Sequence, residues 1–215
     1  MKKILLFAMV LPLLFAGCSK DDDDAAKVND VELYYQQEVP VSEDSYSGTV
    51  ISDGFIASYS GGKIKGLHVG KTTGRTSSNQ TFNIIVKSKV NTIKEISREW
   101  GASRESLINN SDLGAFKKST SDDDVWGATS SDNKIIYMYS FTNGVLSSSS
   151  IVVHVSLADE VADYLKERFN MVNTTSIYGA ASGYDSDNID NAKTIVGVTV
   201  MDASHYVIAF MPKNK

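Results

Sequence analysis

The chain has 215 residues, of which 42% are hydrophobic and 22% charged, and its formal net charge is −5. This composition is typical of a globular protein and excludes a disordered chain, and the length suits one large domain or two small ones. The acidic balance excludes nucleic acid as an expected partner, because phosphate binding requires clustered lysine and arginine.

The chain begins with a short apolar run behind two lysines. Residues 4–15 are apolar or nearly so, two small residues follow, and Cys18 comes next. The run is too short to span the hydrocarbon core of a bilayer, and its layout is that of a secretory signal. We therefore expect residues 1–17 to be a signal peptide.

The residues around Cys18 carry a resemblance. Ala16-Gly17-Cys18 resembles the bacterial lipoprotein box, in which the cysteine becomes lipidated, and the following Ser-Lys-Asp-Asp-Asp-Asp resembles the surface-export signal of Bacteroidetes-type lipoproteins. The resemblance implies acyl chains on Cys18 and an outer-membrane location facing the cell surface. The acidic composition of residues 18–30 predicts a mostly disordered tether. Because Cys18 is the only cysteine, lipidation would leave no thiol for a disulfide, a nucleophile or a metal site.

The sequence pattern of residues 31–90 is typical of a small all-β domain. Short apolar segments are separated by a polar turn at 42–48 and a glycine turn at 60–63. Short strands at this spacing predict a small sandwich. The expected strands are 31–35, 55–59, 64–69 and 81–86.

The segment 55–73, which reads FIASYSGGKIKGLHVGKTT, resembles the closing half of a bacterial Ig-like domain of group 2. The resemblance covers about residues 31–90 and implies an Ig-like sandwich whose final strand is 81–87. The glycines agree with this reading, because they stand where hairpins need positive φ angles.

Residues 91–215 are expected to form a second, α+β domain. The spacing of Ile93, Ile96 and Trp100 predicts a helix over 92–100. Ser103 can cap a second short helix, and the polar stretch 111–124 predicts a loop.

A hairpin and an amphipathic helix follow. Alternation predicts a strand over 134–142, and Asn143-Gly144 is the strongest hairpin signal in the chain, leading into a return strand that ends near Val155. Ser156 to Asp159 resembles a capping box. The residues expected to face the core are Ile135, Tyr137, Tyr139 and Phe141 on the strand, and Leu157, Val161, Leu165 and Phe169 on the helix.

Strands are further expected at 174–180, 192–201 and 205–211. This order of elements predicts helices on one face of an antiparallel sheet. Segments of this half resemble Bacteroidetes lipoprotein domains related to β-lactamase-inhibitor-like or TBP-like folds. The segments are 99–103, 139–146, 167–169 and 206–212. They hold core and turn residues, so the resemblance implies a fold and no activity.

Neither a metal nor a cofactor is predicted. His68, His154 and His205 lack the close spacing of metal ligands, and residues 66–72 lack the glycine spacing and following helix of a phosphate loop. The acidic loop 185–190 fails the calcium-loop pattern at several positions, so a solvated turn is favoured and a calcium site stays the alternative.

Aromatic residues give one indication of binding. Tyr178 and Tyr184 flank the acidic loop, and exposed tyrosines near polar loops suit carbohydrate or protein contacts. Tyr137 and Tyr139 share a strand face, which alternation favours as core.

These features predict a lipid-anchored, non-enzymatic binding or adhesion module for a protein or glycan, with no catalytic residue. One alternative is an envelope hydrolase, in which His154, His205 or the acidic loop meets a serine or a metal. Another is peptidoglycan binding through residues 86–110, which resemble a LysM module but are equally explained by a plain αα-hairpin. An aromatic-lined pocket on the sheet face of 134–211, away from the helices, would favour a ligand-binding role.

Overall fold

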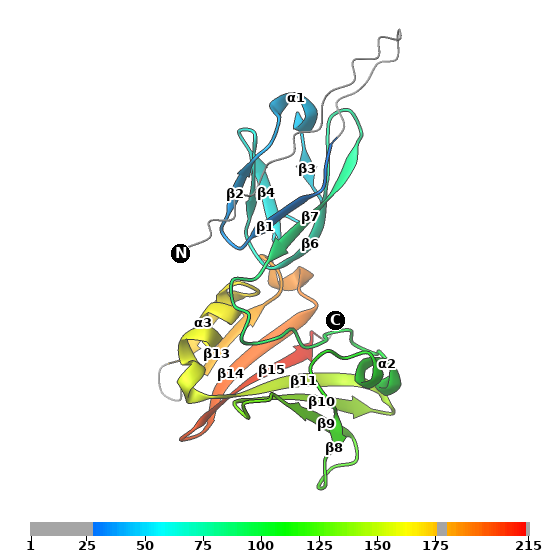
Figure 1. Cartoon of the computed structure of the whole chain (residues 1–215), viewed down its shortest axis with the longest axis vertical. Coiled ribbons are helices and arrows are strands. Elements are labelled where there is room, and N and C mark those ends of the chain that lie inside the picture. Colours follow the sequence, from blue (N-terminus) through cyan, green and yellow to red (C-terminus); the bar gives the residue numbers. More distant parts are fainter. Residues whose placement is uncertain (1–27, 176–179, 214–215) are drawn as a thin grey trace, which may run out of the picture.

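The computed structural model describes residues 28–175 and 180–213 and shows a β-rich chain with several sheets (Figure 1). The predictions for Cys18, for the signal peptide 1–17, for most of the tether and for Tyr178 lie outside the described residues. No helix in the described ranges is long and apolar enough to cross a membrane.

The N-terminal part, residues 28–87, contains two small sheets around one core. The first sheet has the order β1-β7-β6-β3 and the second β2-β5-β4. Both contribute to a single buried cluster that includes Leu33, Ile64, Phe82 and Ile84. The elements are β1 Val31–Tyr34, β2 Glu38–Pro40, α1 Glu43–Tyr46, β3 Val50–Ile51, β4 Ala57–Ser60, β5 Lys63–Gly66, β6 Gly70–Arg75 and β7 Thr81–Lys87.

The predicted strands of this part are confirmed in place but not in extent. The predicted first and last strands correspond to β1 and β7, which pair in parallel. The glycine turn is confirmed, with φ of 55° at Gly61 and 68° at Gly62. Strand β6 was not predicted, because its sequence GKTTGR is polar and only Thr72 and Gly74 point inward. A short helix, α1, occupies the predicted polar turn.

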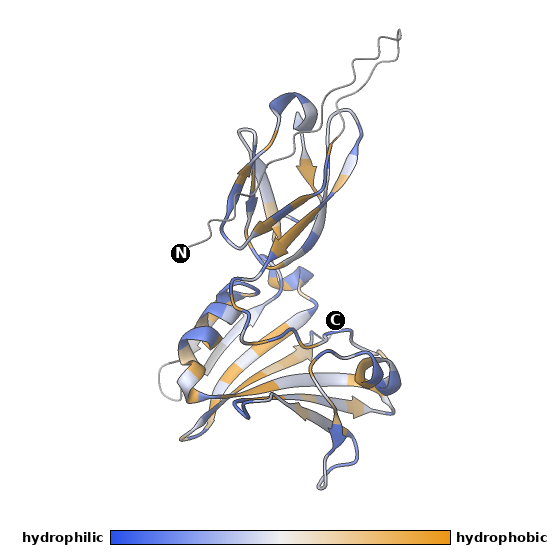
Figure 2. Ribbon diagram, viewed as in Figure 1, coloured by the Kyte–Doolittle hydropathy of each residue, from blue (hydrophilic) through white to orange (hydrophobic). Residues whose placement is uncertain are grey.

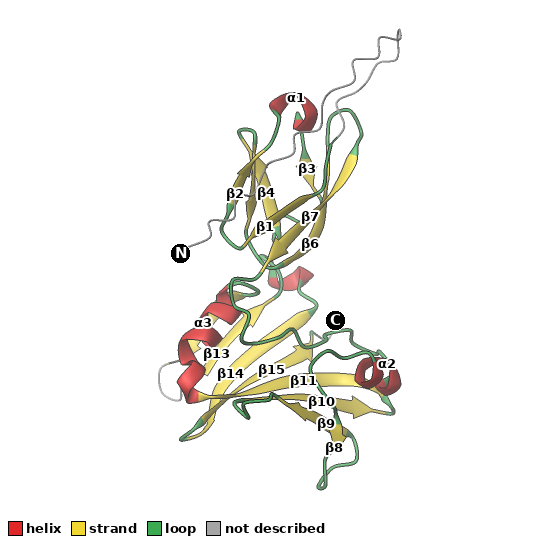
Figure 3. Cartoon of the chain, in the orientation of Figure 1, coloured by secondary structure: helices red, strands yellow, loops and turns green. Residues whose placement is uncertain are grey.

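The C-terminal part, residues 88–213, is built on an eight-stranded sheet of order β12-β13-β14-β15-β11-β10-β9-β8 (Figure 3). Its elements are α2 Arg104–Asn109, β8 Lys117–Lys118, β9 Val125–Thr129, β10 Ile135–Thr142, β11 Val145–His154, η1 Val155–Leu157, α3 Ala158–Lys166, β12 Asn170–Thr175, β13 Ala180–Tyr184, η2 Ile189–Asn191, β14 Thr194–Asp202 and β15 His205–Pro212.

The hairpin of β10 and β11 follows the predicted pattern. Asn143 and Gly144 have φ of 54° and 78°, as a two-residue turn of this type requires. The four residues predicted to share the core face of β10 are all buried. Strands β14 and β15 confirm the two last predicted strands, whereas the prediction for 174–180 falls on the end of β12, the gap at 176–179 and the start of β13.

The predicted helix over 92–100 is wrong. This segment is irregular, although Ile93 and Ile96 are buried as expected. Two buried tyrosines of β10 explain the difference, because the Tyr137 hydroxyl accepts a hydrogen bond from Lys94 N at 2.9 Å and the Tyr139 hydroxyl accepts one from Ser97 N at 3.1 Å. The backbone donors therefore bond to the sheet, and spacing alone could not reveal these partners.

Two local predictions near the helices have different outcomes. Ser103 caps α2 as predicted, and its hydroxyl accepts from Ser106 N at 3.3 Å. The capping box at Ser156 is wrong, because a 3-10 turn precedes α3 and the N-cap residue is Leu157, without a side-chain cap. The predicted loop 111–124 contains β8, and strand β9 was missed because VWGAT alternates weakly.

Helices α2 and α3 pack on one face of the large sheet. Leu107, Val161 and Leu165 lie in the same buried cluster as Tyr139 and Ile151 of the strands. Figure 2 shows apolar residues concentrated on the strands and polar ones on the outer side of α3. The side chains that alternate with the core residues point to the other face of the sheet.

The buried tyrosines predict a loss of stability in alkali. Burial raises the pKa of Tyr137, Tyr139 and Tyr164 above that of an exposed tyrosine, which is about 10. The unfolded chain therefore loses these protons first, so stability is complete below about pH 10 and falls as pH rises further. Urea midpoints measured on both sides of this pH should show the fall. Tyr164→Phe should flatten it, whereas an equally steep fall in that variant would contradict the assignment.

Candidate functional site

A cavity of about 640 Å³ lies at the junction of the N-terminal and C-terminal parts. This volume is in the range of small-molecule sites. Five stretches of the chain line it: residues 53–56 and 69–70 from the N-terminal part, Arg98 and Trp100 from the irregular segment, Arg168 after α3, and residues between 185 and 194 around η2. The cavity thus exists only where the two parts meet.

Glu167 holds the junction together. The residue is 2% exposed, Ser88 Oγ donates to its Oε2, and Lys89 N donates to its Oε1 at 3.0 Å. Its backbone carbonyl accepts from Val69 N at 2.7 Å, which links it to the N-terminal part. Glu167 therefore binds both the segment that follows β7, through Ser88 and Lys89, and the N-terminal part, through Val69.

Arg168 lies beside Glu167 in the wall of the cavity and is only 4% exposed. Its Nη1 donates to Glu167 Oε2 and to the Tyr164 carbonyl, both at 3.2 Å. Its Nε donates to Glu95, and its guanidinium lies 4.0 Å from the centre of the Tyr164 ring. Buried arginine is thus neutralised by two carboxylates, as a buried charge requires.

Two further cationic side chains in the cavity wall form fewer ion pairs within the protein than Arg168 does. Arg98 stacks on Phe169 and Phe210, at 5.1 and 5.9 Å from the ring centres, and its nearest carboxylate is Glu95 at 3.6 Å. Lys193 is exposed, and its ammonium forms no ion pair with any described residue. These two groups can therefore offer donors to a ligand.

The aspartates in the cavity wall accept hydrogen bonds from backbone N–H groups. Asp53 Oδ1 accepts from Phe55 N at 3.0 Å. Asp185 Oδ1 accepts from Lys193 N at 2.9 Å and from Thr194 N at 3.0 Å, and so closes the acidic loop. The Nε1 donor of Trp100, another wall residue, is buried and has no partner within the described ranges.

The acidic loop 185–190 is a hydrogen-bonded turn. Asn188 Oδ1 caps η2 by accepting from Asp190 N at 2.9 Å, and Asp190 lies 3.8 Å from the Lys213 ammonium. Among the residues that the structure describes, no group of three or more histidine, cysteine, aspartate or glutamate side chains is placed to hold a metal ion.

The structure brings two of the three histidines together. The rings of His154 and His205 lie 5.6 Å apart at the end of the β11–β15 pair. His154 Nδ1 contacts Ser156 Oγ at 2.9 Å, whereas His205 Nδ1 contacts Asp202 at 3.0 Å. A serine-histidine-carboxylate relay needs one imidazole between the hydroxyl and the carboxylate, and here the two contacts fall on different rings. His68 lies apart, stacked on Phe55.

The predicted aromatic residues separate into two classes. Tyr137 and Tyr139 are buried core residues, as favoured from alternation. Tyr184 is half-buried and lines a second hollow of about 580 Å³ with Asn170, Val172 and residues of the acidic loop. The segment 86–110 contains a single helix, α2, so the αα-hairpin expected there is absent.

Comparisons of the chain with family models, curated proteins and solved structures found no match.

Proposed function

We propose that this protein is a lipid-anchored lipoprotein of the outer membrane that binds a protein or glycan in its junction cavity. The anchor follows from the resemblance of residues 16–24 to lipoprotein signals. The two sheets of the N-terminal part support an Ig-like domain that acts as a spacer. The large sheet with its helices supports a separate α+β head.

The cavity carries the proposal. Its wall combines cationic donors, two aromatic residues and small polar side chains around a volume suited to part of a polymer or a small ligand. Arg98 and Lys193 are charged groups whose hydrogen-bonding capacity the described protein leaves largely unused. Charge-assisted hydrogen bonds to such groups contribute about 1.5–3 kcal/mol each.

A binding assay tests this function. The full chain with Cys18→Ser should appear in the soluble fraction, whereas the unsubstituted chain should fractionate with membranes. The soluble form is then applied to arrays of glycans and of envelope proteins. We expect a ligand whose affinity falls at least about tenfold in Lys193→Ala, because a hydrogen bond to a charged group is lost.

Lys117→Ala provides the matched control, because Lys117 is an exposed lysine on β8 outside the cavity. Its binding should equal that of the parent. Failure of both arrays, or equal binding by the Lys193→Ala protein, would refute the cavity as the binding site.

A further inference from the structure

The face of the large sheet opposite the helices has an unusual composition. Alternation and strand register place Ile136, Met138, Val152, Ile195, Val207 and Ala209 on it, and we call these residues the open face. Val152 is only 5% exposed, yet it belongs to neither buried cluster. The other five residues are partly exposed, so these side chains lie outside both buried cores.

The open face lacks charge. The outward-facing positions of β9, β10, β11, β15 and β14 carry no lysine, arginine, aspartate or glutamate until the rim. There Asp202 pairs with His205 at the end of the hairpin, and Lys117 of β8 lies opposite Gly127. In an antiparallel sheet with one solvated face, each strand normally alternates apolar residues toward the core with polar residues toward solvent. The open face instead combines its apolar residues with serine, threonine and glycine, and an uncharged surface that exposes several apolar side chains together is a candidate interaction site.

Small residues lie on both sides of Met138 at the centre of the surface. The register aligns Gly127, Met138, Ser150, Ala209 and Gly197 in one row across five strands. A side-chain carbon added at Gly197 would meet no atom within 4 Å. The space above Gly197 could therefore take a side chain of a second sheet, as happens between sheets stacked about 10 Å apart.

The dimensions favour a second copy of the chain as the occupant. Five strands spaced about 4.8 Å apart and about seven residues of 3.4 Å each give a face of roughly 600 Å². Two such faces together would bury roughly 1,200 Å², which is the lower end of the range for specific interfaces. The interior of the face carries no charge, so no like charges meet there when two copies pack across a two-fold axis.

We infer that two copies of this protein associate through their open faces, with the large sheets stacked and the helices outside. This association is independent of any ligand in the junction cavity, which lies among other residues. It also gives a role to the serine run, since Ser148 and Ser150 are small side chains of the open face.

Sedimentation of the soluble Cys18→Ser chain tests the inference. We expect a dimer at micromolar concentration, and a monomer at the same concentration for both Ala209→Glu and Ala209→Lys, because each places like charges opposite one another. A mixture of the two variants should restore a dimer, since opposite charges then meet. That restoration separates a broken interface from a misfolded chain.

Ala162→Glu is the matched control, because Ala162 is exposed on α3, on the helix side of the sheet. It should leave the dimer intact. A parent chain that is monomeric at about 100 μM, an Ala209→Glu protein that still dimerises, or a mixture that stays monomeric would each overturn the inference.

Discussion

Replacement of Glu167 by alanine is expected to lower the free energy of unfolding by about 3–5 kcal/mol, the range for breaking a buried ion pair. The substitution would remove the acceptor of Ser88 and Lys89 and one of the carboxylates that neutralise Arg168. A buried guanidinium would then lack part of its compensation. Urea denaturation followed by tryptophan fluorescence measures the effect.

The stability of two other variants provides the comparison for Glu167→Ala. Glu167→Gln keeps the shape of the side chain and an acceptor oxygen, so its loss should be smaller than that of alanine. Glu99→Ala removes an exposed carboxylate of the same junction segment and should change stability by no more than about 0.5 kcal/mol. A Glu167→Ala protein as stable as the Glu99→Ala protein would show that the junction does not depend on this carboxylate.

Replacement of Phe169 by alanine is expected to cost about 3–5 kcal/mol, as is typical for a buried phenylalanine. Phe169 is 2% exposed and packs against Phe210 with ring centres 5.7 Å apart. Its ring also supports the Arg98 guanidinium. We therefore expect ligand affinity to fall as well, because the Arg98 guanidinium loses one of the two rings on which it stacks.

Thermal and urea unfolding measure the first effect, and binding at a temperature where the variant is fully folded measures the second. Val172→Ala on the neighbouring strand is the control, since Val172 is 53% exposed. Unchanged affinity in a folded Phe169→Ala protein would show that ligand binding does not depend on the support of Arg98 by the Phe169 ring.

Sequence patterns predicted those elements whose determinants are local. The Asn143-Gly144 turn needs only two residues with positive φ, and the alternation along β10 needs only its own side chains. The stripe of α3 is equally self-contained: Leu157, Val161 and Leu165 are all buried. In each case the signal and the structure lie within one short segment.

Predictions failed where partners lie far away in the sequence. The segment 92–100 has helical spacing, but its amides donate to tyrosines about forty residues later. Likewise, Glu167 and Arg168 lie in a segment whose resemblance to known domains implied only a fold. Their partners Ser88 and Glu95 precede them by 79 and 73 residues. No spacing rule joins such positions, so the cavity that they support could not be foreseen.

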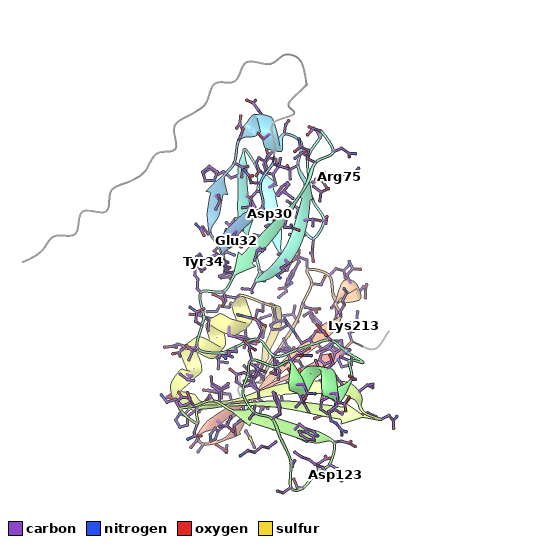
Figure 4. The ribbon with its side chains drawn as sticks, turned by 45° about the vertical axis from the view of Figure 1, so that its right-hand side comes forward. Asp30, Glu32, Tyr34, Arg75, Asp123 and Lys213 are labelled. Carbon is purple, nitrogen blue, oxygen red and sulfur yellow. The ribbon has the colours of Figure 1, made fainter. Side chains whose placement is uncertain are left out.

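The parallel pairing of β1 with β7 has a mechanical consequence. Figure 4 shows Asp30, Glu32 and Tyr34 in a row along β1, running toward the C-terminal part, and the chain leaves β7 at the same end, where Lys87 is opposite Tyr34. If the chain is tethered before β1 and holds a ligand beyond β7, tension pulls the two strands in opposite directions along their length. The hydrogen bonds between them are then loaded together in shear, so a tethered molecule would resist extension until the whole ladder yields.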